Sequence, residues 1–213
     1  MIQDYYEVIQ KYVHRNNVKL DEKIIKAKAD TLKCKFPDSM IKFYQHYGLN
    51  NEILNSYYNI NKIDDVRIEK NALIFGSTHQ NSSLLGIKDE NLYKINPPVN
   101  EYVLDLQNWY AECIFADCFF FNIACWQILN QMPSIAKIQI SEDKFNNLCN
   151  KLFFPICSEK HMRKGYYIIS CQNNRQNILM CFLRESDELY MSSFNDVNLE
   201  KFEEELQEDF DWL

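Results

Sequence analysis

The chain opens with the hydrophobic spacing of amphipathic helices. Apolar residues recur every three or four positions from Ile2 to about His14, and again after Leu20, where Asp21 can cap a helix N-terminus. The strongest pattern is KFPDSMIKFYQHYG, residues 35–48. Its apolar stripe falls at i, i+3, i+4 and i+7: Met40, Phe43, Tyr44 and Tyr47. We therefore predict three helices before residue 50.

The third of these helices has marked ends. Pro37 fits the first helical turn, where its missing N–H costs nothing, and Asp38 suits the positive end of the helix dipole. Gly48 can take the left-handed conformation that terminates a helix. The sequence thus predicts both a start and a stop for this helix.

Short β-branched and aromatic runs replace the helical spacing between residues 53 and 106. Strands are predicted at three strong patterns and two weaker ones: 72–77, 83–87, 101–106, then 56–60 and 91–95. The connections are too short for crossover helices, which predicts a mostly antiparallel sheet. Asn96-Pro97-Pro98 predicts a turn or a sheet edge, since neither proline can donate a hydrogen bond to a neighbouring strand.

The segment 111–132 is apolar on most sides, which predicts a helix that other elements of the fold cover. Pro133 is expected to end this helix. It overlaps the longest run without a charge, Cys118–Ala136, whose polar residues argue against a membrane span. A helix near 141–153 follows, then strands at hairpin spacing over 165–172, 177–185 and 187–195. A last amphipathic helix is predicted to carry Leu199, Phe202, Leu206 and Phe210.

These elements predict an α+β fold, in which a mostly antiparallel sheet is flanked by helices. The chain divides into an α+β domain at 1–135 and a C-terminal extension at 136–213, which either continues the same sheet or forms a subdomain. A chain of 213 residues with 46% hydrophobic residues is large enough for one substantial core. Position 4 is acidic and no basic stretch leads into an apolar one, so we expect a cytoplasmic protein without a signal peptide.

The net charge of −7 is concentrated at the end of the chain. In NLEKFEEELQEDFDWL, residues 198–213, seven acidic residues accompany one base, Lys201. Such a run is typical of the solvated face of an amphipathic helix, and it also speeds association with a basic partner. The nearly neutral remainder gives little support for a nucleic-acid-binding face. We expect a basic protein partner, contacted at Glu203, Glu204, Glu208, Asp209 and Asp211.

Motifs that carry catalysis or bind cofactors are missing from the sequence. It has four glycines and no glycine-rich phosphate loop, G-x-S-x-G or H-E-x-x-H. The eight cysteines lie in apolar surroundings, which is typical of reduced core thiols. Cys157 and His161 approach a zinc-ligand spacing but lack a second pair. We expect no catalytic residue, no cofactor and no metal. The alternative is a thiol hydrolase that pairs Cys157 or Cys171 with His161 or His79.

Four segments resemble, in order, the SUKH superfamily. The family signature "LP..y..fy...nG" is resembled by FPDSMIKFYQHYG, and its central strands are resembled by ALIFGSTHQNSSLLGI. Its "d-P-V-y" strand, which is followed by an aromatic position, is resembled by NPPVNEYVLDLQNW. Its closing helix is resembled by IFADCFFFNIACWQIL. The resemblance covers about residues 20–131. Departures are Tyr47 in place of the asparagine before Gly48, and Asn96 and Asn100 around the prolines. The matched positions are interpreted as scaffold: Pro37, Phe43, Tyr44, Gly48, Pro98 and Trp109.

The resemblance implies a binding function. Bacterial SUKH proteins are similar to immunity proteins that neutralise toxin domains, often nucleases, and the fungal founder regulates cell-wall synthesis through protein contacts. A nuclease is typically basic around its substrate groove, which an acidic inhibitor can occupy. The leading hypothesis is therefore a non-enzymatic immunity protein with an acidic contact surface. The alternative is an intracellular scaffold or regulatory module without a toxin target.

Overall fold

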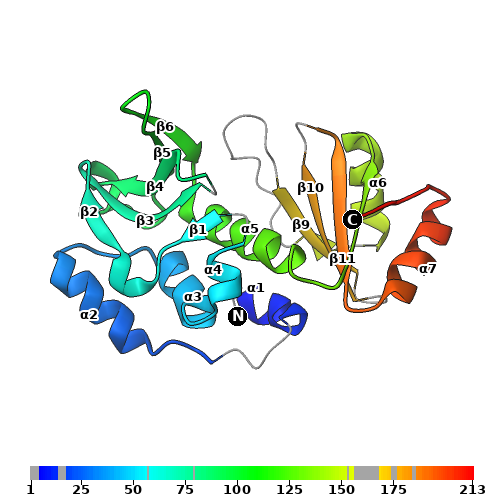
Figure 1. Ribbon diagram of the computed structural model, residues 1–213, viewed down its shortest axis with the longest axis horizontal. Helices are drawn as coiled ribbons and strands as arrows, with labels where there is room; N and C mark the ends of the chain where they lie inside the picture. Colours follow the sequence, from blue (N-terminus) through cyan, green and yellow to red (C-terminus); the bar gives the residue numbers. More distant parts are fainter. Residues whose placement is uncertain are drawn as a thin grey trace.

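The structure is a computed structural model, which describes residues 5–13, 18–56, 58–78, 80–152, 154–155, 168–173, 177–183 and 186–213. The fold is α+β, with two antiparallel sheets and helix α5 (Ala116–Leu129) running between them (Figure 1). This confirms the predicted fold class. The two sheets are separate, so the C-terminal part does not continue the first sheet.

Four helices of the described chain precede the first sheet: the first, third and fourth contact α5, whereas the second packs on the third. They are α1 (Tyr5–Ile9), which continues as the 3-10 turn η1 (Gln10–Tyr12), then α2 (Glu22–Leu32), α3 (Asp38–Tyr47) and α4 (Asn51–Leu54). Asp21 caps α2 as predicted, because its carboxylate accepts the Lys23 N–H at 2.9 Å. The predicted first helix begins and ends in residues outside the described part; residues 5–12 are helical, whereas Val13 is already extended.

The ends of α3 differ from the prediction. Pro37 lies one residue before the helix, with an extended ψ of 146°. Gly48 keeps right-handed angles (φ −61°, ψ −17°), so the expected left-handed stop is wrong. Space explains the glycine instead: a Cβ there would lie 2.5 Å from the Tyr44 carbonyl oxygen and 3.0 Å from Leu20 Cδ2. Gly48 is needed because a side chain there would collide with the backbone of the last helical turn, with Leu20 packed beside it.

The first sheet has strand order β1-β3-β4-β5-β6, and β2 pairs with β3 beside β1. The strands are β1 (Tyr58–Ile60), β2 (Arg67–Glu69), β3 (Ala72–Thr78), β4 (Ser83–Lys88), β5 (Val99–Val103) and β6 (Asn108–Cys113), with 3-10 turns η2 (Ile63–Asp65) and η3 (Asp89–Asn91). All pairings are antiparallel, as predicted. The proline pair lies in the connection just before β5, also as predicted.

Two strand predictions in this sheet are wrong. Residues 91–95 form the end of η3 and turns closed by the Leu92 N–H on the Asp89 carbonyl and the Lys94 N–H on the Asn91 carbonyl. The predicted strand 101–106 ends at Val103, because residues 104–107 form the hairpin turn that leads into β6. Consequently residues 111–113 belong to β6, although the apolar run suggested a helix from 111.

The second sheet has strand order β12-β7-β11-β10-β9-β8. Its elements are β7 (Ser134–Gln139), α6 (Glu142–Leu152), β8 (Phe154–Pro155), β9 (Ile168–Asn173), β10 (Ile178–Leu183), β11 (Glu188–Ser193), α7 (Asp196–Leu206) and β12 (Asp211–Trp212). The meander β9-β10-β11 and helix α6 were predicted, whereas β7 and β12 were not. The boundary drawn between residues 135 and 136 falls inside β7.

The predicted last helix is too long. It ends at Leu206, and Gln207 takes a left-handed conformation with φ 56°. The chain then returns along β7, so Phe210 lies beyond the helix and still packs on Phe202, with ring centroids 6.2 Å apart. Burial of Phe210 is thus achieved by chain reversal rather than by another helical turn.

Helix α5 is the centre of the larger core. Apart from Asp117, all of its residues are buried, including the aromatic run Phe119–Phe121. Phe120 contacts Phe43 of α3 and Phe75 of β3, at centroid distances of 5.5 and 4.9 Å. A second core lies between the second sheet and helices α6 and α7, where Phe145 and Phe182 stack at 4.4 Å. Within the described chain, the helices all lack the length and apolar character that crossing a bilayer needs.

Candidate protein-binding surface

Helix α7 carries acidic residues on its outer side because its apolar residues face the core. Asn195 starts the helix by accepting the Val197 N–H at 2.9 Å, and Leu199 and Phe202 are fully buried. The charged side chains therefore point toward solvent. With the segment that follows, they form what we call the acidic surface: Glu200, Glu203, Glu204, Glu205, Glu208, Asp209 and Asp211.

Strand β12 holds the end of the chain beside α7. Asp211 pairs with Lys137 and Trp212 with Ala136 of β7, and the Leu213 N–H donates to the Ile135 carbonyl at 3.0 Å. Phe210, buried at 7% exposure, anchors the same segment in the second core. The acidic surface therefore has a defined shape rather than being a free tail.

The structure divides the predicted contact residues into two groups. Glu203 and Glu208 have structural partners: Glu203 Oε1 accepts the Phe210 N–H at 2.7 Å, and Glu208 forms an ion pair with Lys144 of α6. Glu204, Asp209 and Asp211 are exposed. All five predicted residues lie at one end of the second sheet, and the exposed three are the more available to a partner.

Exposed apolar residues border the acidic surface and were not predicted. Trp212 and Leu213 are 44% and 66% exposed at the edge of the second sheet. Phe194 and Val197 are 38% and 45% exposed where β11 leads into α7, a turn tied to the start of β7 by a hydrogen bond from Ser134 to Asp196. Aromatic and apolar residues among charges are typical of protein interfaces. In the sequence, these apolar residues could have been recognised from Trp212 and Leu213, which directly follow the acidic Asp211.

The residues interpreted as scaffold are mostly buried. Phe43, Tyr44 and Gly48 lie inside the larger core, and Pro37 is buried at the start of α3. The Tyr44 hydroxyl donates to the Asn61 carbonyl at 2.8 Å, and burial raises the pKa of Tyr44. Pro98 is half-buried just before β5.

Trp109 lies half-buried on the face of the first sheet that points away from α5. Its ring packs on Tyr102 at 5.1 Å between centroids, and its Nε1–H donates to the Lys70 carbonyl at 3.3 Å. The ring also covers Gly86, where a Cβ would lie 3.3 Å from it. Trp109 therefore anchors β6 on its own sheet, which is a structural role outside the main core.

The described cysteines lack the surroundings of a nucleophile. Cys113, Cys118, Cys125 and Cys181 are buried, and Cys34 is half-buried. Burial, with a further contribution from Asp89, raises the pKa of the Cys34 thiol, whereas a nucleophile needs a lowered one. Cys157, His161 and His79 lie outside the described residues, as does the side chain of Cys171. Among the described residues, His, Cys, Asp and Glu side chains form no cluster that could hold a metal.

Charge is polarised along the long axis of the molecule. Residues 19–35, which contain α2, carry six lysines and three acidic residues, whereas residues 198–213 carry seven acidic residues and one lysine. Helices α2 and α7 lie at opposite ends (Figure 1). A charge separation of this kind orients the molecule in the field of a charged partner before contact.

Comparisons with protein-family models, with curated proteins and with solved structures find no match to this chain. The functional interpretation therefore depends on the geometry and charge of the surfaces described above.

Proposed function

We propose that this chain is a non-enzymatic binding protein that docks its acidic surface on a basic region of a partner protein. The observation that supports the proposal is the placement of the charge. Seven acidic residues within residues 198–213 lie on helix α7, on edge strand β12 and on the connection between them, and Phe202 and Phe210 anchor this segment in the second core. A rigid acidic surface loses little conformational entropy on binding, and this favours affinity.

The composition of the surface suits both fast association and a stable complex. Exposed carboxylates attract a basic partner over a distance of about 10 Å at moderate salt. Trp212 and Leu213 add apolar area beside them, and interfaces commonly gain most of their binding energy from such residues. We infer that the carboxylates mainly set the association rate and that Trp212 mainly sets the dissociation rate.

The partner that we propose is a toxin domain, such as a nuclease, whose substrate groove is basic. Two points support this choice: residues 20–131 resemble the SUKH superfamily, and a surface of clustered carboxylates resembles the polyanion that such a groove binds. In this proposal the protein acts in the cytoplasm and blocks the toxin by occupying the groove.

The test uses toxin domains encoded beside the gene and measures binding kinetics by surface plasmon resonance. The informative variant neutralises the exposed carboxylates: Glu204→Gln, Asp209→Asn and Asp211→Asn. Its matched control neutralises Glu90, Asp64 and Asp105, which are exposed elsewhere. We expect the association rate to fall by about tenfold or more in the first variant and to change little in the control.

Two results would contradict the proposal in different ways. Unchanged binding of the Glu204/Asp209/Asp211 variant would show that the acidic surface is not the contact. Absence of binding to every neighbouring toxin domain, with stable capture of a host regulatory protein, would show that the chain is a scaffold or regulator instead.

A further inference from the structure

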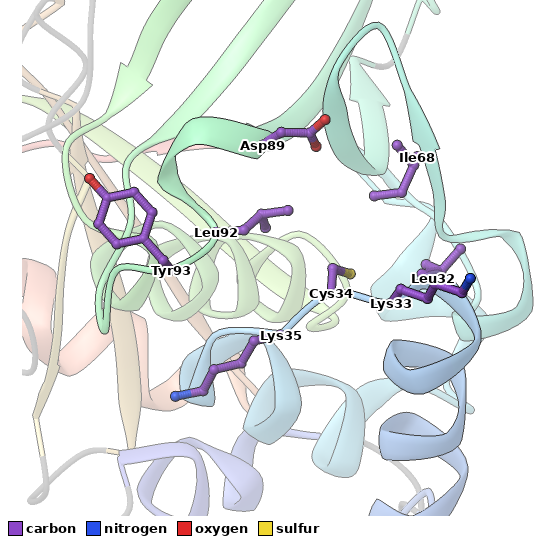
Figure 2. A pocket seen from close by; sticks show the side chains of 8 residues that line it. All are labelled: Leu32, Lys33, Cys34, Lys35, Ile68, Asp89, Leu92 and Tyr93. Atoms are coloured by element: carbon purple, nitrogen blue, oxygen red, sulfur yellow. The ribbon is translucent and has the colours of Figure 1, made fainter.

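A cavity of about 510 Å³ lies at the α2 end of the molecule, opposite the acidic surface. It is formed where the segment after α2 meets β2 and the end of η3, and we call it the α2 pocket. Leu32, Cys34, Ile68 and Leu92 line its interior, with Asp89 above them (Figure 2). The volume lies within the range of about 300–1,000 Å³ that is usual for ligand pockets.

The α2 pocket combines an apolar interior with a charged rim, which carries two lysines and the carboxylate of Asp89. Lys33 and Lys35 extend to opposite sides of the segment that carries Cys34 (Figure 2), and both are exposed. Ile68 and Tyr93 are exposed by 41% and 78%, although both are large apolar side chains. An apolar pocket bordered by lysines suits an aromatic side chain that is followed or preceded by carboxylates.

The same chain carries a segment of that chemistry at its other end. Trp212 is 44% exposed, and Asp209 and Asp211 precede it. Pairing of β12 with β7 holds this segment in place, so a molecule cannot bring its own Trp212 across its long axis to its own α2 pocket. Contact between the two surfaces therefore requires two copies.

We propose that copies of this chain associate head to tail, with Trp212 of one copy entering the α2 pocket of the next. Asp209 and Asp211 then face Lys33 and Lys35 across the interface. The two surfaces are different, so the contact is heterologous: in a pair, one copy keeps a free α2 pocket and the other keeps a free Trp212. Association consequently extends beyond a dimer as concentration rises. The proposal is independent of the toxin partner, which it would compete with for the acidic surface.

Sedimentation velocity of the full chain over a range of concentrations tests the proposal. We expect the average mass to increase with concentration at low salt and to return to that of one chain at about 1 M salt, where the Debye length is about 3 Å. Two variants should each weaken association by about tenfold or more: Trp212→Ala, and the double variant Lys33→Glu/Lys35→Glu. The controls are Leu106→Ala and Lys42→Glu, which alter exposed residues away from both surfaces and should associate like the wild type.

Mixing the two variants gives the sharpest result. The Trp212→Ala chain keeps an intact α2 pocket, and the Lys33→Glu/Lys35→Glu chain keeps an intact Trp212. An equimolar mixture should therefore form a heterodimer that grows no further, at concentrations where each variant alone is still monomeric. Circular dichroism of each variant confirms that it is folded.

Other outcomes would overturn head-to-tail association. A wild-type chain that stays monomeric at all concentrations would show that Trp212 does not enter the α2 pocket of another copy. Association that survives both variants, or variants that fail to complement each other, places the contact elsewhere. Binding of a basic partner by the Lys33→Glu/Lys35→Glu variant tests the proposed function separately, because its acidic surface is unchanged.

Discussion

Gln127 allows a quantitative test of how the core is held together. It lies in the last turn of α5 with no exposed surface, among apolar residues. Its Nε2 donates to the Ile53 carbonyl, and its Oε1 accepts the Tyr58 N–H at 3.1 Å. One side chain thus satisfies two backbone groups in the segment that leads from α4 into β1. Gln127→Met keeps about the same side-chain length but replaces the carboxamide with a thioether, which removes both hydrogen bonds.

The burial of the two partners sets the expected cost. Ile53 is 1% exposed, so its orphaned carbonyl should cost about 2–3 kcal/mol, whereas the half-buried Tyr58 N–H should cost about 1 kcal/mol. Burying a thioether in place of an amide offsets about 1 kcal/mol of this. We therefore expect Gln127→Met to lower the free energy of unfolding by about 2–3 kcal/mol.

Urea unfolding followed by tryptophan fluorescence measures the change. With an unaltered slope of about 2–3 kcal/mol/M, the midpoint should fall by about 1 M. Gln139→Met is the matched control, because Gln139 makes the same kind of bond, from Nε2 to the Ser186 carbonyl at 2.6 Å, but is exposed. Water can replace that bond, so the control should change stability by less than about 0.5 kcal/mol. Equal effects of the two substitutions would refute the argument that burial decides the cost.

Three further predictions concern other parts of the fold. Gly86→Ala should lower stability by about 1–3 kcal/mol, because the added Cβ would lie 2.9 Å from the Leu73 carbonyl oxygen, which is backbone; an unchanged melting temperature would contradict this. Phe182→Ala should cost about 3–5 kcal/mol by removing the ring that stacks on Phe145, as urea unfolding would measure; a loss below about 1 kcal/mol would show that the second core adds little. The hydrogen bond from Lys137 lowers the pKa of Glu188, so this carboxylate stabilises the fold above its ordinary pKa of 4.5, and the contribution is lost as the pH falls through the lower folded-state pKa. The stability difference between the wild type and Glu188→Gln should consequently shrink in acid, and a difference that is independent of pH would refute the assignment.

Local patterns were sufficient for much of the secondary structure. Helix α2 was predicted with its Asp21 cap, and α3 was predicted from its apolar stripe, because both depend on residues within a few positions of one another. The β9-β10-β11 meander was predicted for the same reason, since short polar turns separate its apolar runs. The concentration of negative charge in residues 198–213 was equally visible, because charge needs no partner to be counted.

Only the tertiary structure decided features that depend on distant residues. Strands β6, β7 and β12 were missed because pairing across the sequence defines them: β12 exists only where Asp211 and Trp212 meet β7. The role of Gln127 depends on Ile53 and Tyr58, neither of which is a sequence neighbour. The candidate sites follow the same division. The sequence determined which residues are acidic, and the fold determined that they are held on a rigid edge beside Trp212, at the opposite end from the α2 pocket.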